Sequence, residues 1–303
     1  MISVYKDLKE KVHNNPQGSR FVFGGISGIV SRTFTAPIDR VKVLKQTKRL
    51  DIINESFRII IHKEGFKSLW QGNLINCMKN SPENAIRFSF HNKLKNVLYP
   101  NASNIETLPR FLIACTSGLV SMSCVYPLEV IKIRKVISTS KQKSGIADTI
   151  RRIYKEGGIR AFYRGYRVAM LSYIPYSGME LTLYEIFKRN YLFYIYKFDC
   201  NQKRNLPHLK FYESCILIIF SSLIPMTIVY PANLLRTRFQ ASQSNKERKI
   251  LPNLRHIAEK EGVVGLYRGF TTQMFKTTPS VLFSYMTMEL LLETFGMPSF
   301  GTK

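Results

Sequence analysis

The sequence predicts an all-α membrane protein with six transmembrane helices, arranged as three pseudo-threefold repeats of one helix pair. Two observations lead to this prediction. The segments Phe111–Leu128 and Ser214–Leu235 contain no charged residue and no histidine over 18 and 22 residues, close to the roughly 20 residues that cross a bilayer. A set of short motifs also recurs three times along the 303 residues, which is the signature of a repeat architecture.

The first motif contains a proline followed by a charged pair. It appears at Ala36–Lys42, Tyr126–Lys132 and Tyr230–Arg236. A second motif, Lys-Glu-Gly followed by an aromatic residue and a glycine, recurs after each copy and ends at Gly72, Gly165 and Gly269. Each unit therefore holds two long helices, and the six prolines expected to kink them are Pro37, Pro82, Pro127, Pro175, Pro231 and Pro279.

Each repeat also contains a short basic amphipathic stretch between its long helices. In Ile52–Lys63 the residues Ile53, Phe57 and Ile60 share one helical face, opposite Arg58. Such a helix is expected to lie at a membrane surface, where its cations meet anionic headgroups. We predict one transmembrane domain over residues 1–303, with repeats at 18–99, 108–195 and 208–296.

Composition limits the function. A formal charge of +25 predicts an anionic partner, which is nucleic acid, an anionic lipid surface or a multiply charged small solute. No glycine-rich phosphate loop, nucleophile–base arrangement or metal cluster is present, so neither an enzyme, a cofactor nor a metal site is expected. The five cysteines, among them Cys200, suggest neither a disulfide framework nor a zinc site. The first fifteen residues have the features of neither a secretory signal nor a transit peptide.

Residues at equivalent repeat positions should lie at the same depth around one axis. Two and five residues after the first proline of each repeat, the chain has an acid and a cation, with one exception. These positions hold Asp39 and Lys42, Glu129 and Lys132, and Asn233 and Arg236. We predict that they pair between helices and close a pore, with Asn233 removing one of three ion pairs. The alternative is a local pair within each helix.

Gln46 and Gln240, nine residues after their prolines, are expected either to brace this ring by hydrogen bonding or to form polar helix ends. A second ring is predicted near the other end of the pore. It comprises Asn92, Lys95, Glu185, Lys188 and Glu289, with Leu292 in place of a cation. At most two ion pairs can form there, and such partly buried pairs suit a gate that must open.

Two pairs of small residues are expected to allow close helix approach. Gly24 and Gly28 precede Pro37 by thirteen and nine residues, and Ala114 and Gly118 occupy the same positions before Pro127. Small residues four apart let helix backbones come together in lipid.

The tripled proline motif resembles that of the mitochondrial carrier family, and the similarity runs from about Phe21 to about Phe295. This resemblance implies six tilted helices around a cavity, three short matrix-side helices and solute exchange across the inner membrane. It identifies the proline ring as the matrix gate and the second ring as the cytoplasmic gate. It also implies cardiolipin at the helix starts marked by Gly72, Gly165 and Gly269, and a monomeric, multi-pass protein.

Positions that differ among the repeats should bind the solute. The residues chosen on this ground are Arg32, Lys79, Arg87, Ser172, Tyr173, Tyr176 and Lys276. Their cations favour a solute with several negative charges, and the tyrosines offer a wall on which a planar base can stack. The alternatives are packing or an interface belt for the tyrosines and snorkelling for the lysines.

The strings Gly72–Asn76 and Pro82–Phe88 are similar to the branch of carriers that handles adenine nucleotides, ATP-Mg/phosphate and coenzyme A. The sequence therefore predicts an antiporter of a phosphorylated, nucleotide-type anion. Three other readings stay open: a carrier of another anion, a carrier-derived proton leak or receptor, and a soluble nucleic-acid-binding protein.

Overall fold

The structure, a computed structural model, describes residues 16–47, 53–100, 107–138, 145–196, 211–242 and 250–296. Two of the sequence-based interpretations concern residues outside these ranges, namely the first fifteen residues and Cys200. Within the described residues, the long helices are α2 (Pro16–Gln46), α4 (Asn73–Leu98), α5 (Thr107–Ile137), α7 (Tyr166–Tyr196), α8 (Phe211–Ala241) and α10 (Phe270–Thr294). The six predicted prolines all lie inside these helices, and α8 contains Pro225 as well.

The short helices are α3 (Ile53–Glu64), α6 (Ile146–Gly157) and α9 (Ile250–Leu266), and the first two are followed by the 3₁₀ turns η1 (Phe66–Trp70) and η2 (Gly158–Tyr163). The order long, short, long thus recurs three times. In the predicted amphipathic stretch, Ile60 is buried and Phe57 packs on the same core, whereas Arg58 is exposed. The predicted apolar face therefore points inward.

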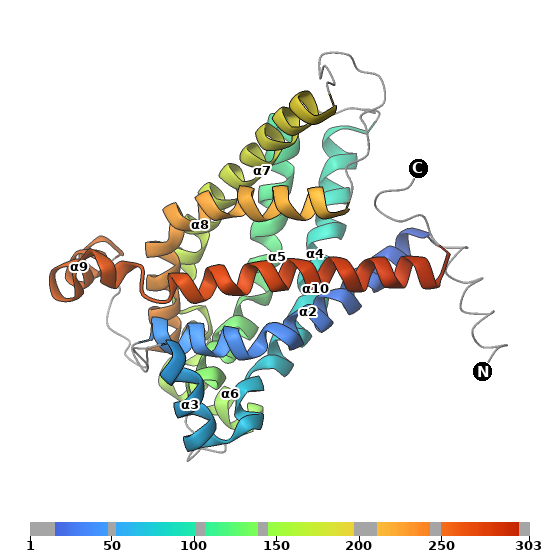
Figure 1. Cartoon of the computed structure of the whole chain (residues 1–303). Coiled ribbons are helices and arrows are strands. Elements are labelled where there is room, and N and C mark those ends of the chain that lie inside the picture. Colours follow the sequence, from blue (N-terminus) through green and yellow to red (C-terminus); the bar gives the residue numbers. More distant parts are fainter. Residues whose placement is uncertain are drawn as a thin grey trace, which may run out of the picture.

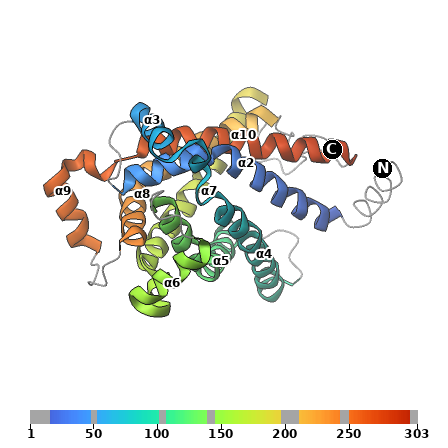
Figure 2. The same ribbon diagram turned by 90° about the horizontal axis from the view of Figure 1, so that it is seen from below.

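The long helices form a closed ring. Neighbouring helices pack as α2 on α4, α4 on α5, α5 on α7, α7 on α8, α8 on α10 and α10 on α2. Figure 1 shows α2 and α10 side by side, and Figure 2 shows the short helices on the outside of the ring. The last contact closes the ring because it joins the first and last described helices.

Ion pairs tie each short helix to the long helix before it. The Arg134 guanidinium lies 2.9 Å from Glu156 and that of Arg238 lies 2.8 Å from Glu261, while Arg40 pairs with Glu64. The three glutamates come from the three Lys-Glu-Gly motifs. This explains why that motif recurs: its acid holds the short helix against the proline helix.

A glycine precedes α4, α7 and α10, and in each case the backbone is left-handed. Gly72, Gly165 and Gly269 have φ of 88°, 80° and 86°. Residues with a Cβ rarely adopt this conformation, so the glycines allow the sharp turn from each short helix into the following long one.

The outer surface of the ring is apolar. Ile216, Phe220, Ile224 and Ile228, four residues apart on α8, are all exposed. Two helices, Leu108–Ile137 and Tyr212–Ala241, are long and apolar enough by themselves to cross a membrane. Among the other long helices, α2, α4 and α10 carry charges that line an internal cavity, as expected for charged residues at membrane depth.

Candidate functional site

The ring of long helices encloses a cavity of about 750 Å³. Six of the seven predicted solute-binding residues line it: Arg32, Lys79, Ser172, Tyr173, Tyr176 and Lys276. All eight residues of the predicted matrix gate line it as well: Asp39, Lys42, Gln46, Glu129, Lys132, Asn233, Arg236 and Gln240. We call the part of the cavity that these eight residues form the cavity floor. Arg87 is not among the lining residues and lies 3.8 Å from Glu83, one turn away on α4.

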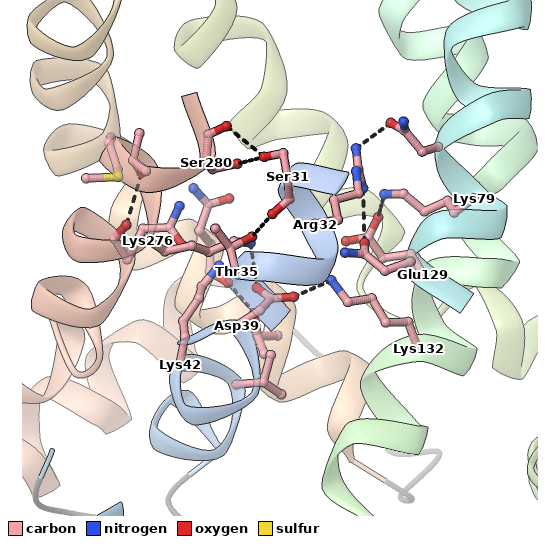
Figure 3. Close-up of a pocket in the computed structure, with 18 of the residues that line it drawn as sticks. Ser31, Arg32, Thr35, Asp39, Lys42, Lys79, Glu129, Lys132, Lys276 and Ser280 are labelled. Carbon is pink, nitrogen blue, oxygen red and sulfur yellow. Dashed lines mark hydrogen bonds and ion pairs between the residues drawn. The ribbon is translucent and has the colours of Figure 1, made fainter. Parts of the chain in front are cut away.

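Asp39 of α2 is shared by two cations from other helices. Its Oδ2 atom lies 2.6 Å from the ammonium of Lys132 on α5, and its Oδ1 atom lies 2.6 Å from the ammonium of Lys276 on α10 (Figure 3). Asp39 forms no ion pair with Lys42, which is three residues away on the same helix. The pairing is thus between helices, as predicted, and not local.

Glu129 of α5 repeats this arrangement. Its Oε1 atom lies 2.9 Å from the Arg236 guanidinium on α8, and its Oε2 atom lies 2.6 Å from the Lys79 ammonium on α4. Lys79 also contacts Glu83 at 3.3 Å. Lys79 and Lys276, predicted as cavity cations, therefore bind the carboxylates of the floor instead of pointing free into the cavity.

Three groups of residues at the cavity floor follow from the repeats, and we call them floor triads. The first triad is Asp39, Lys132 and Lys276; the second is Glu129, Arg236 and Lys79; the third, by equivalent position, is Asn233, Lys42 and Ser172. In the third triad an amide replaces the acid and a hydroxyl replaces one cation. Each triad consequently carries one net positive charge, and the three triads together carry three.

The predicted glutamine braces are present and bind tyrosines. Gln46 donates to the Tyr230 hydroxyl at 3.1 Å, and Gln240 donates to the Tyr126 hydroxyl at 3.0 Å. Each tyrosine directly precedes a motif proline and donates onward to a backbone carbonyl at the end of the following short helix region. At the contact between α2 and α5, the equivalent residues are Val136 and Ala36, which are both buried.

Arg32 of α2 is held by neutral groups. Its guanidinium donates to the side-chain oxygens of Asn76 at 3.0 Å and Asn80 at 2.6 Å, both on α4. Asn84, one turn further, donates to Asn80. Sequence reasoning missed these asparagines, although polar residues at every fourth position of a membrane helix are a usable signal. With amides as partners, Arg32 keeps its full charge for an anion.

Two glycines make room for cavity residues. A Cβ atom on Gly28 would lie 2.3 Å from Asn80 Nδ2, and one on Gly118 would lie 1.9 Å from the Tyr173 hydroxyl. Asn80 and Tyr173 occupy the same position, two residues before the second proline of their repeats. The predicted close approach is thus between each glycine and a polar side chain of the cavity.

The remaining predicted solute-binding side chains make bonds within their own helix. Ser172 donates to the carbonyls of Val168 at 2.8 Å and Ala169 at 3.1 Å. The Tyr176 hydroxyl donates to Glu180 at 3.2 Å. Tyr176 and Tyr173 both line the cavity on α7, so one wall of it carries aromatic rings.

At the other end of the cavity, the predicted second ring is not assembled. In the part of the chain that the structure describes, no ion pair joins any of Asn92, Lys95, Glu185, Lys188 and Glu289. Leu292 is buried with Phe23 and Met288 where α10 packs on α2. The missing cation of this ring is therefore replaced by a residue of a small hydrophobic core.

Comparison with known proteins agrees with this geometry. The family model described as mitochondrial carrier protein matches residues 13–102, 103–194 and 207–299. The calcium-binding mitochondrial carrier protein SCaMC-2-B of Danio rerio is 38% identical over 285 residues, which cover 92% of this chain and 59% of that protein. The mitochondrial adenyl nucleotide antiporter SLC25A24 of Homo sapiens is 36% identical over 281 residues, covering 90% of this chain and 57% of that protein.

The mitochondrial adenyl nucleotide antiporter SLC25A25 of Mus musculus is 36% identical over 286 residues, covering 92% of this chain and 59% of its own length. The chain thus spans less than two thirds of the length of these relatives. The matched residues contain the three proline motifs, the short helices and all three floor triads. The chain belongs to the mitochondrial carrier family.

Proposed function

We propose that the protein is a multi-pass carrier of the mitochondrial inner membrane that exchanges a phosphorylated anion of the nucleotide type by alternating access. The solute class comprises adenine nucleotides, ATP-Mg/phosphate and coenzyme A. The observation that carries the proposal is the sharing of Asp39 and Glu129 between a floor cation and a cavity lysine. This sharing couples solute binding to the closure of the floor.

The coupling follows from charge. An anion that enters the cavity attracts Lys79 and Lys276, which now neutralise Glu129 and Asp39. When the lysines turn to the anion, each carboxylate keeps a single partner, Arg236 or Lys132. Because a buried ion pair is only weakly stabilising once desolvation is counted, the floor then opens at a small cost.

The charge of the cavity supports a phosphorylated solute. Three net positive charges on the floor triads, together with Arg32, match an anion with three or four negative charges, and low-dielectric walls strengthen that field. Tyr173 and Tyr176 supply rings on which a base can stack. Two of the relatives are named as adenyl nucleotide antiporters, which agrees with this solute class.

The resemblance to the carrier family, and not the charge coupling, assigns the sides of the two gates. On that basis we propose that the floor is the matrix gate, closed here, and that the second ring is the cytoplasmic gate, open here. Cardiolipin is proposed at the turns that Gly72, Gly165 and Gly269 permit, and the working unit is proposed to be a monomer.

Exchange of labelled ADP by the purified protein in liposomes tests the proposal. Lys79→Ala and Lys276→Ala should each lower the exchange rate about ten- to hundredfold, the effect of losing one hydrogen bond to a charged group. Lys93→Ala is the matched control, because Lys93 lies on α4 with Lys79 but is exposed and does not line the cavity. Intact exchange in both cavity variants would refute the role of the two lysines, and a proton leak without exchange of any nucleotide or coenzyme A would refute the function.

A further inference from the structure

The third floor triad differs from the other two in its hydrogen bonds. The Lys42 ammonium lines the cavity floor and, among the described residues, forms no ion pair and no hydrogen bond. The Asn233 side-chain amide also lines the floor and makes no hydrogen bond within the described chain. Figure 3 shows Lys42 one turn below Asp39, whose two carboxylate oxygens are taken by Lys132 and Lys276. The Lys42 ammonium and the Asn233 amide therefore both line the cavity with hydrogen-bonding groups that no described residue uses.

The surroundings of Lys42 make its isolation costly. Lys42 interacts electrostatically with Asp39, but also with Lys276, Lys132 and Arg236, which are cations. Asp39 already pairs with both Lys132 and Lys276, so its single negative charge does not serve as a counter-ion for Lys42. A buried cation without a counter-ion is unfavourable, and an anion placed beside it removes this cost.

Neighbouring side chains cannot supply that anion. Asn233 stands where the other repeats have a carboxylate, and its amide is neutral. Ser172 directs its hydroxyl to carbonyls of its own helix. Gln46, one turn after Lys42, donates to Tyr230. Gln46 Oε1 is an unpaired acceptor, but it is neutral. None of these side chains supplies a negative charge, so the anion that Lys42 lacks comes from the solute.

We propose that Lys42 and Asn233 form a phosphate subsite on the cavity floor. A phosphate group fits because it carries about 1.5 to 2 negative charges at neutral pH and several acceptor oxygens. The Lys42 ammonium supplies a point charge for it, a role in which lysine is common, and the Asn233 amide supplies a neutral donor. In the first and second triads a carboxylate of the chain occupies the equivalent position, whereas in the third triad the phosphate of the solute takes it.

This subsite rests on the proposed function, since it holds one phosphate of the transported anion, but it is tested by binding and not by transport. Purified full-length protein in detergent is titrated with inorganic phosphate and, separately, with ADP, and its thermal stabilisation is measured. A ligand that binds the folded state raises the melting temperature. Four variants are compared: Asn233→Asp, Asn233→Ser, Lys42→Gln and Lys42→Arg.

Asn233→Asp supplies the missing carboxylate, so Lys42 gains an internal partner and the ligand-free protein stays folded. We expect phosphate or ADP to bind this variant and Lys42→Gln about tenfold more weakly, the effect of one lost charge-assisted hydrogen bond. Asn233→Ser keeps the position neutral and Lys42→Arg keeps the charge, so both should bind within about threefold of the original protein.

Equal stabilisation of Asn233→Asp and the original protein by both ligands would overturn the subsite. Equal weakening in Asn233→Ser and Asn233→Asp would also overturn it, because charge would then not be the cause. These results are independent of transport. If the protein exchanges ADP but Asn233→Asp binds both ligands as the original protein does, the proposed function holds and the subsite is wrong. If the variants bind as expected but the protein exchanges no nucleotide, the subsite holds and the proposed function is wrong.

Discussion

The two ends of the cavity contain residues of similar type but differ in how these residues pair. At the floor, two carboxylates each bind two cations from different helices at 2.6 to 2.9 Å. At the opposite end, Glu185, Glu289, Lys95 and Lys188 form no ion pairs with one another in the described part of the chain. Ion pairs thus join the helices at the floor, whereas at the open end α10 packs on α2 through apolar side chains.

This difference indicates that closing one end of the cavity depends on how the helices position their charged side chains as much as on which residues are present. The proline motifs place acid and cation on neighbouring helices at the floor, while η1, η2 and the short helices fix the ends of those helices from outside. The other end has no such support from short helices among the described residues, and its main apolar contact is the core of Leu292 with Phe23 and Met288. Under the proposed exchange by alternating access, the paired ring is the closed end of the cavity and the unpaired ring is the open end.

Removing a carboxylate from the floor should produce the largest effect. Asp39→Asn leaves Lys132 and Lys276 without a counter-ion in a buried site, so we expect a loss of about 3–5 kcal/mol in stability and almost no exchange. Thermal denaturation in detergent and exchange in liposomes measure the two effects.

Glu289→Gln is the matched control, since it removes a carboxylate at the open end that forms no ion pair among the described residues. Its stability should change by less than about 0.5 kcal/mol. Similar destabilisation by the two substitutions would show that the two ends do not differ as the structure indicates.

Leu292→Lys tests the open end by adding a charge there instead of removing one. It restores the cation that the repeats predict there, but Leu292 is 1% exposed in the core between α2 and α10. We expect a loss of about 2–5 kcal/mol, because a charge replaces a packed leucine. Thermal denaturation of Leu292→Met, which conserves volume, gives the control, expected to lose less than about 1.5 kcal/mol. A more stable lysine variant would mean that residue 292 faces the ring and not the core.

Much of this comparison could be predicted from the sequence, because a motif that recurs in three repeats places its residues at the same depth around one axis. The three proline motifs predicted ion pairs between neighbouring helices, and the structure contains two of them, Asp39 with Lys132 and Glu129 with Arg236. The amphipathic stretch predicted as Ile52–Lys63 is helix α3, Ile53–Glu64. Periodicity and fixed spacing decide such features locally.

Other features depend on side chains whose partners the sequence does not reveal. Lys79 and Lys276 were expected to face the solute, and their bonds to Glu129 and Asp39 could not be predicted without knowing the depth of each helix. Gly28 was interpreted as a helix contact, whereas the structure places Asn80 against it. Both cases depend on the rotation of α4 and α10 relative to α2, which packing of the whole ring determines.

Gly28→Ala should produce a smaller effect in the region between the two ends. The new methyl group would meet Asn80 Nδ2 and displace a side chain that accepts from Arg32. We expect a loss of about 1–3 kcal/mol, typical of overpacking, together with weaker binding of ADP. Gly24→Ala is the control on the same helix, because a methyl group added there would have nothing within 4 Å, and alanine should slightly stabilise the helix. Equal melting temperatures for the two variants would contradict this contact.

The glutamine braces should produce the smallest effects, and their inequality is the useful result. Gln46→Leu and Gln240→Leu each remove one hydrogen bond to a tyrosine that keeps its bond to a carbonyl, so each should cost about 1 kcal/mol. The contact of α5 with α8 retains the pair of Glu129 with Arg236, whereas at the contact of α8 with α2 the equivalent residues, Asn233 and Lys42, form no ion pair in the described part of the chain. Gln46→Leu should therefore lower the melting temperature more than Gln240→Leu, and adding Asn233→Asp should offset the loss only in the Gln46 variant. The idea is wrong if both glutamine variants lower the melting temperature by the same amount and Asn233→Asp restores both to the same extent. The ring would then respond as one unit, and its three helix contacts would not be separately stabilised.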